Sequence, residues 1–180
     1  MQLQQTLKGK YTFEGKGLHT GKVAKMTVCP APVDTGILFK RTDIGEEALV
    51  EALAENVSNT ARSTTISKGN ASVSTIEHIM SALTGMGVDN ALVEIDNVEV
   101  PILDGSAKPY IDAIWPDGLQ QQDAPRRYVE VTDTIEIRND EKGSVVRIEP
   151  ADEFSYEIMV DFNSRVLGVQ HAGWNDSVLY

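Results

Sequence analysis

Apolar and polar residues alternate along several short stretches of the chain, and glycine or proline bounds most of them. An alternation of period two is typical of a strand with one buried face. The pattern predicts strands over residues 7–13, 23–29, 36–41, 91–95, 128–137, 144–148 and 154–162. We expect the last three to form a meander with a hairpin turn over 140–143. Two further stretches, 48–53 and 56–66, fit either a loop or a strand.

One segment has the period of a helix instead. It begins near Ser74, and Ser74 and Glu77 fit a capping box, in which each side chain bonds the backbone N–H of the other residue. The apolar face of this helix consists of Ile76, Ile79, Met80 and Leu83. Gly85 and Gly87 are the expected stop signal. A second, shorter helix is predicted over residues 106–114.

The first helix carries a glutamate–histidine pair off its apolar face. At about 100° per residue, His78 lies about 200° and Glu77 about 100° from Ile76. We therefore expect His78 to meet solvent, a ligand or another packed element. An imidazole suits zinc, and a neighbouring carboxylate can deprotonate zinc-bound water. The pair alone is a weak signal, because Glu77 could be only a capping residue and His78 an ordinary exposed histidine.

The composition is that of a globular protein. Of the 180 residues, 41% are hydrophobic and 24% are charged, which is too apolar for a disordered chain. The whole formal net charge of −11 lies in the second half, so no basic stripe remains and nucleic acid is not an expected partner. The single cysteine, Cys29, excludes an internal disulfide and a cysteine-based zinc finger, and it fits a small core residue.

Targeting signals and domain boundaries can also be sought in the sequence. The start of the chain has no apolar signal-peptide region, and no apolar run approaches the roughly 20 residues of a membrane helix. We therefore expect a cytoplasmic protein with no transmembrane segment. Residues 117–127 are polar and contain glycine and proline, so they are the predicted boundary between two domains.

Other candidate residues have weaker patterns around them. His19 lies in a glycine-rich stretch that permits close approach of the backbone to a ligand, although it fits an exposed hairpin equally well. Asp104 lies in a Pro-x-x-Asp-Gly-Ser turn, where an aspartate most often bonds its own turn. His171 is assigned no role.

Four stretches of the chain together resemble a known family. They are GKGLHTGK (15–22), PAPVDTGILFKRTD (30–43), STIEHIMSALTGMGVDNALVEID (74–96) and VPILDGSAKPY (100–110). In this order and spacing they resemble the UDP-3-O-acyl-N-acetylglucosamine deacetylases, the zinc enzymes of lipid A and lipopolysaccharide biosynthesis. The resemblance implies an α+β protein: a two-layer domain of sheet and helices over residues 1–122, then the opening strands of a second similar domain over 123–180.

The resemblance also implies roles for single residues. His78 is expected to be a zinc ligand and Glu77 the general base that activates water. Zn²⁺ is the expected cofactor, and Fe²⁺ is an alternative because these ligand types do not separate the two metals.

The remaining expected site residues come from other parts of the chain. Ser63 and Thr64 match a stretch that lines the substrate site, and His19 and Asp104 are expected to be supporting residues. The sequence departs from many family members at residues 61–63, where Ala-Arg-Ser replaces larger apolar or cysteine side chains.

The expected reaction is hydrolysis of the N-acetyl group of UDP-3-O-acyl-N-acetylglucosamine. The family's other zinc ligands, its general-acid histidine and its oxyanion threonine come from a C-terminal half that has no counterpart before Tyr180. We therefore expect this chain alone to bind zinc weakly and to be inactive without that missing half. Two alternatives stay open, a non-enzymatic α+β binding module on the same scaffold and a different zinc amidohydrolase.

Overall fold

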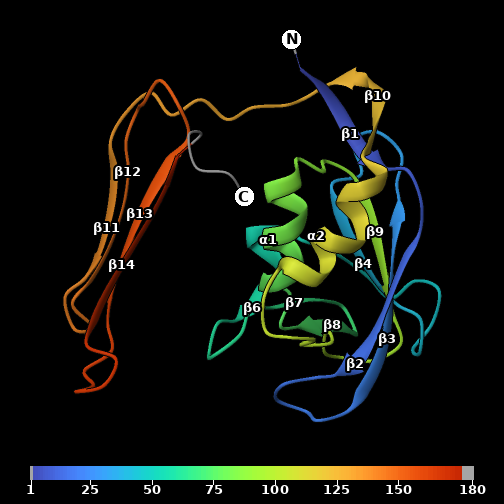
Figure 1. Cartoon of the computed structure of the whole chain (residues 1–180), viewed down its shortest axis with the longest axis horizontal. Coiled ribbons are helices and arrows are strands. Elements are labelled where there is room, and N and C mark those ends of the chain that lie inside the picture. The colour runs from blue at the N-terminus through green and yellow to red at the C-terminus, as the bar shows by residue number, and fades with distance from the viewer. Residues whose placement is uncertain (1, 176–180) are drawn as a thin grey trace. The chain divides into compact units, whose positions relative to one another are not determined.

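The computed structural model describes residues 2–175 of the chain. These residues form two units, which divide between Arg126 and Arg127. The first unit contains β1 (Leu3–Leu7), β2 (Tyr11–Lys16), β3 (Val23–Pro30), β4 (Ile37–Arg41), β5 (Leu49–Glu51), β6 (Val57–Asn59), β7 (Thr65–Lys68), β8 (Ala71–Ser74), α1 (Glu77–Met86), β9 (Ala91–Ile95), α2 (Lys108–Ile114) and β10 (Leu119–Pro125). The second contains β11 (Ile135–Asn139), β12 (Ser144–Ile148), β13 (Ser155–Asp161) and β14 (Val169–Asn175). The protein is an α+β protein, as the sequence predicted (Figure 1).

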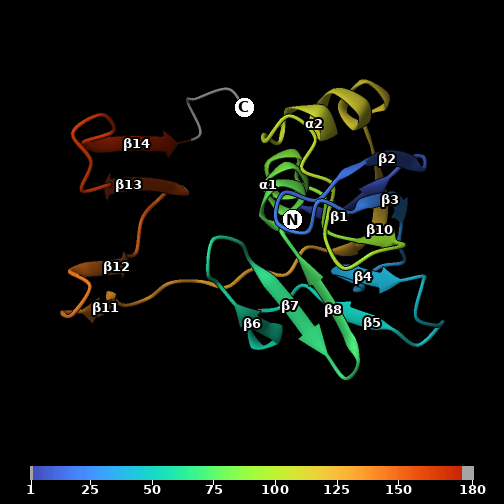
Figure 2. The same cartoon turned by 90° about the horizontal axis from the view of Figure 1, so that it is seen from below.

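The centre of the first unit is a five-stranded sheet in the order β2-β3-β9-β4-β5. Its neighbours are antiparallel except β4 and β9, which run parallel. Parallel neighbours need a crossover, and here the chain passes through β5 to β8 and α1 before it returns as β9. Figure 2 shows the small sheet of β6, β7 and β8 beside the β4–β5 edge. The crossover therefore carries α1 and the small sheet together.

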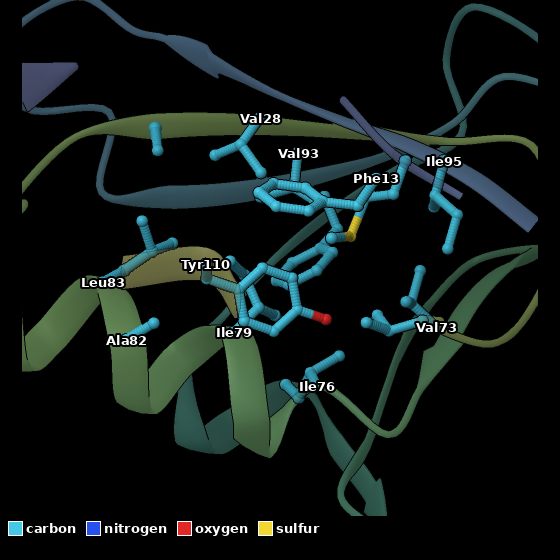
Figure 3. Close-up of a cluster of buried hydrophobic side chains, with 14 of the residues drawn as sticks. Phe13, Val28, Val73, Ile76, Ile79, Ala82, Leu83, Val93, Ile95 and Tyr110 are labelled. Carbon is cyan, nitrogen blue, oxygen red and sulfur yellow. The ribbon is translucent and has the colours of Figure 1, made fainter. Parts of the chain in front are cut away.

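The hydrophobic core lies between the five-stranded sheet and the two helices. Ile79 and Leu83 of α1 face Val93 of the sheet, and the rings of Phe13 and Tyr110 fill the space between them (Figure 3). The two rings meet edge to face, with centroids 4.8 Å apart. Full burial of a side chain such as Leu83 contributes about 1.5–3 kcal/mol. This packing fixes α1, and with it the residues at its first turn.

Most predicted strands of the first unit are present, with one clear correction. The strand predicted over 91–95 matches β9, and those predicted over 23–29 and 36–41 match β3 and β4. The strand predicted over 7–13 is wrong, because residues 8–10 separate β1 from β2. The two strands belong to different sheets: β1 pairs with β10, and β2 pairs with β3.

The polar stretch 117–127 contains a strand. Its residues Leu119–Pro125 form β10, which pairs with β1 and so belongs to the first unit. Most of its side chains are exposed, which is why the stretch has few apolar residues. The first unit therefore extends to Arg126, four residues beyond position 122, where the first domain was expected to end.

The second unit consists of two hairpins. The predicted turn over 140–143 joins β11 to β12, and β12 matches the strand predicted over 144–148. The predicted meander is wrong, because the partner of β13 is β14, from a stretch whose sequence pattern gave no prediction. No helix among residues 2–175 is both long enough and apolar enough to span a membrane.

Candidate functional site

The glutamate–histidine pair lies on the first turn of α1, whose start differs from the prediction. The helix begins at Glu77, while Ser74 is the last residue of β8 and its hydroxyl donates to the carbonyl of Val98 (3.3 Å). Between them, Thr75 has a φ of 60°, which lies in the left-handed region. The Glu77 carboxylate accepts a hydrogen bond from the backbone N–H of Thr64 (3.0 Å). The predicted capping box is therefore wrong, because both of its side chains bond elsewhere.

The buried face of α1 also lies further along the helix than predicted. Its buried residues are Ile79, Ala82, Leu83 and Met86. Measured from Ile79 at about 100° per residue, His78 lies about 100° away and Glu77 about 160° away. The predicted order around the helix is therefore wrong, and Glu77 lies farther from the core than His78. The error arose because Ile76, taken as the centre of the stripe, precedes the first helical residue. Both Glu77 and His78 are half-buried.

The predicted substrate-binding residues Ser63 and Thr64 lie next to this turn. They belong to the loop between β6 and β7 and are half-buried. Besides donating to Glu77, Thr64 accepts at its carbonyl from the backbone N–H of Ile76 (3.4 Å). The structure therefore brings Thr64 into contact with Glu77, with Ser63 next to Thr64 in the loop, and the bond holds one carboxylate oxygen of Glu77 in place.

An open hollow of about 460 Å³ borders Glu77 and Thr64. Apolar side chains supply most of its wall, among them Leu53, Ile66 and Met80. A carboxylate at the edge of an apolar hollow can act as a base while the walls hold the apolar part of a ligand.

The predicted supporting residue His19 lies on a tight turn between β2 and β3. The turn is closed by the backbone N–H of Gly17, which donates to the carbonyl of Lys22 (2.9 Å). The imidazole of His19 is exposed, but its backbone N–H and that of Thr20 donate to the carboxylate of Glu99 (2.9 and 2.7 Å). His19 is thus placed by its backbone.

Glu99 is a functional candidate that the sequence analysis missed. It is only 1% exposed, and it also accepts a hydrogen bond from the hydroxyl of Thr75 (3.0 Å). Burial raises the pKa of Glu99, but the hydrogen bonds from Thr20, His19 and Thr75 outweigh burial and hold that pKa below its ordinary value. The one signal in the sequence was a charged residue between two valines.

Asp104 bonds its own turn, as its sequence pattern predicted. Its carboxylate accepts from both the hydroxyl and the backbone N–H of Ser106, each at 2.9 Å, and these bonds lower the pKa of Asp104. The turn is anchored beside the His19 turn, because the N–H of Ile102 donates to the carbonyl of Lys16 (3.0 Å). The structure therefore places the two supporting turns at the same end of β2.

The described residues do not by themselves complete a zinc centre. A structural or catalytic zinc takes at least three protein ligands. Within residues 2–175, no three histidine, cysteine, aspartate or glutamate side chains come together in a way that could hold a metal ion. His171 lies on β14 of the second unit, with its Nε2 3.9 Å from Glu157, and Cys29 is a buried core residue, as predicted.

Comparison with known proteins identifies the family. The family model described as "LpxC: UDP-3-O-acyl N-acetylglycosamine deacetylase" matches residues 4–178. A bifunctional enzyme LpxC/FabZ of Porphyromonas gingivalis is 46% identical over 172 residues, which cover 96% of this chain and 37% of that protein. A UDP-3-O-acyl-N-acetylglucosamine deacetylase of Geobacter sp. (strain M21) is 49% identical over 146 residues, which cover 81% of this chain and 48% of that protein.

A third relative shows the same partial coverage. The UDP-3-O-acyl-N-acetylglucosamine deacetylase of Thioalkalivibrio sulfidiphilus is 41% identical over 171 residues, which cover 94% of this chain and 56% of that protein. The chain spans about half the length of the curated single-function relatives and a smaller share of the bifunctional one. Because the family model matches nearly the whole chain, the chain belongs to the UDP-3-O-acyl-N-acetylglucosamine deacetylase family.

Proposed function

We propose that this chain carries the general base of an enzyme that hydrolyses the N-acetyl group of UDP-3-O-acyl-N-acetylglucosamine, a step of lipid A biosynthesis. Family membership supports the proposal. The observation that carries it is the placement of Glu77, which is half-buried, held by the N–H of Thr64 and set at the edge of the apolar hollow.

The proposed reaction follows from these contacts. Water adds to the carbonyl carbon of the substrate's acetamide while Glu77 accepts a proton from that water. The tetrahedral intermediate then collapses as the carbon–nitrogen bond breaks and a proton passes to the leaving amine, which releases acetate and the free amino sugar. The N–H of Thr64 bonds Oε2 of Glu77, so we assign Oε1 as the proton acceptor.

We further propose that His78 is one ligand of a zinc ion, with iron as the alternative. An imidazole at the first turn of α1, next to a carboxylate base, is the donor type that these metals accept. Because the described residues do not gather three ligands, we propose that the other ligands belong to a segment that matches the rest of the relatives' length. No step of the reaction above is assigned to the metal.

Zinc titration of the 180-residue chain tests the metal proposal. We expect weak binding that becomes weaker still in His78→Ala, while His171→Ala, a matched change in the second unit, leaves it unchanged. Tight one-to-one binding that His78→Ala abolishes would contradict the proposal, because the chain would then complete its own site.

A deacetylation assay tests the role of Glu77. The chain is joined to the part of the Geobacter relative that it does not match, and acetate release is measured. Glu77→Gln should lower turnover by about 10²–10⁴-fold, the usual contribution of a general base, without loss of bound zinc. Glu55→Gln, an exposed matched change, should not lower it. Full activity in Glu77→Gln would rule out the assigned role.

A further inference from the structure

Glu99 is a buried carboxylate that the proposed reaction does not use. We propose that Glu99 is a positioning residue, which holds the His19 turn and the entry into α1 in one fixed arrangement. The inference rests on the proposed function, because the positions of Glu77 and His78 matter to catalysis only if that function is right. The contacts that carry the inference come from three separate segments of the first unit.

The side chain of Glu99 joins two of these segments. Its Oε1 accepts from the N–H of His19 and the hydroxyl of Thr75, and its Oε2 accepts from the N–H of Thr20. Hydrogen bonds to an ionised, buried carboxylate are stronger than those between neutral groups. One carboxylate therefore ties the His19 turn to the residue two positions before Glu77.

The backbone around Glu99 reinforces this tie. The N–H of Ser74 donates to the carbonyl of Val98 (2.8 Å), and the N–H of Val100 donates to the carbonyl of Ser74 (3.1 Å). Residues 98–100 are thus hydrogen-bonded to the backbone of Ser74, while the side chain of Glu99 is hydrogen-bonded to Thr75.

Thr75 is held in a conformation that it would not adopt unaided. Its φ is 60°, in the left-handed region that a β-branched residue rarely enters. Such a residue persists only where its surroundings hold it, and here its hydroxyl bonds Glu99. The conformation of Thr75 sets the direction in which the chain enters α1. It therefore sets where Glu77 and His78 point.

The His19 turn lies against the same carboxylate. A Cβ built on Gly17 would lie 2.2 Å from Oε2 of Glu99 and 2.7 Å from Oγ1 of Thr20. Only glycine leaves room for the carboxylate at this distance. The glycine of the turn, the buried carboxylate and the strained threonine are therefore parts of one arrangement.

Nuclear magnetic resonance of the labelled 180-residue chain, without metal or substrate, tests the inference. Two quantities are measured: amide hydrogen exchange at His19 and Thr20, and the imidazole signals of the three histidines. Glu99→Gln removes the charge and replaces one accepting oxygen with an NH2 group, so exchange should speed up at both amides, and about tenfold at the amide that loses its acceptor, the effect of losing one hydrogen bond. It should also move the imidazole signal of His78 and leave that of His171 in place. Glu14→Gln, an exposed matched change on β2, should alter neither.

A second pair of variants separates positioning from general stabilisation. Thr75→Ser keeps the hydroxyl that Glu99 accepts, so the His78 signal should stay. Thr75→Val keeps the branched shape but removes the hydroxyl, so the signal should move. If Glu99→Gln does not fold, this pair alone decides the question.

Two results would overturn the inference. One is faster exchange at His19 and Thr20 with no movement of the His78 signal, which would mean that Glu99 stabilises the His19 turn only. The other is equal behaviour of Thr75→Ser and Thr75→Val. None of these measurements needs metal or turnover. Their result is therefore independent of the deacetylation assay, which tests the proposed function itself.

Discussion

Replacing Gly17 with alanine should destabilise the first unit through a direct clash. The added Cβ would lie 2.2 Å from Oε2 and 2.6 Å from Cδ of Glu99, far inside van der Waals contact. Gly17 does not have a positive φ, so backbone strain adds nothing and the effect is steric. Either the carboxylate or the turn must move.

The loss of folding stability is set by whichever of these two movements costs less free energy. Moving the carboxylate weakens hydrogen bonds to a charged acceptor, which are worth about 1.5–3 kcal/mol each. Moving the turn costs about 1–3 kcal/mol, as overpacking usually does. Alanine also restricts the unfolded chain, which returns about 0.4–1 kcal/mol. We expect a net loss of about 2 kcal/mol, or about 8 °C in melting temperature for a unit of this size.

Amide hydrogen exchange in β3 and β9 is the suitable assay, because these central strands report the opening of the first unit alone. Two glycines are controls. A Cβ on Gly9 would come no closer than 3.5 Å to Tyr11, so Gly9→Ala should be neutral or slightly stabilising. Gly21 has open space but a φ of 65°, so Gly21→Ala should cost about 1 kcal/mol. The steric reasoning fails if Gly17→Ala is as mild as Gly9→Ala.

Three further predictions concern pH and packing. Burial raises the pKa of Tyr110 above 10.0, so the contribution of the protonated phenol to folding stability is complete below about pH 10 and is lost at higher pH. Tyr110→Phe should therefore lose less stability at alkaline pH, as measured by urea denaturation at several pH values. The pKa of Glu99 lies below 4.5, so the contribution of its carboxylate to folding stability is present above that pH and is lost on acidification. Glu99→Gln should therefore be less stable than the unchanged chain at pH 7 and should lose less stability toward about pH 3. Leu83→Ala should cost about 2–5 kcal/mol in urea denaturation, whereas exposed Thr84→Ala should stay within about 0.5 kcal/mol, and equal losses would contradict the assigned buried face.

Local patterns were sufficient for elements whose stabilising contacts are themselves local. The period-two pattern located β9 and β12, and Gly87 ends α1 in the left-handed conformation that its position predicted. The start of α1 could not be predicted in the same way. Ser74 fits a cap by sequence, but residues 98–100, far along the chain, pair with its backbone and take its hydroxyl.

The same difference between local patterns and long-range contacts decides which parts of the candidate site could be predicted. Glu77 and His78 stand out only through the family resemblance, since the pair alone was a weak signal. Glu99 escaped notice because its importance depends on three segments that meet only in the folded chain. The strands β1 and β10 escaped notice because both are rich in polar residues, and their pairing is visible only in three dimensions.

The pairing of β1 with β10 has a consequence for how the first unit is made. Leu7 pairs with Leu119, so the first strand to be synthesised waits for more than a hundred residues before its partner exists. The unit can close only after that segment has left the ribosome, and such long-range closure is slow. The same pairing sets the two ends of the unit side by side. A circular permutation that joins them and opens the exposed stretch 42–47 should therefore preserve both the fold and the first turn of α1.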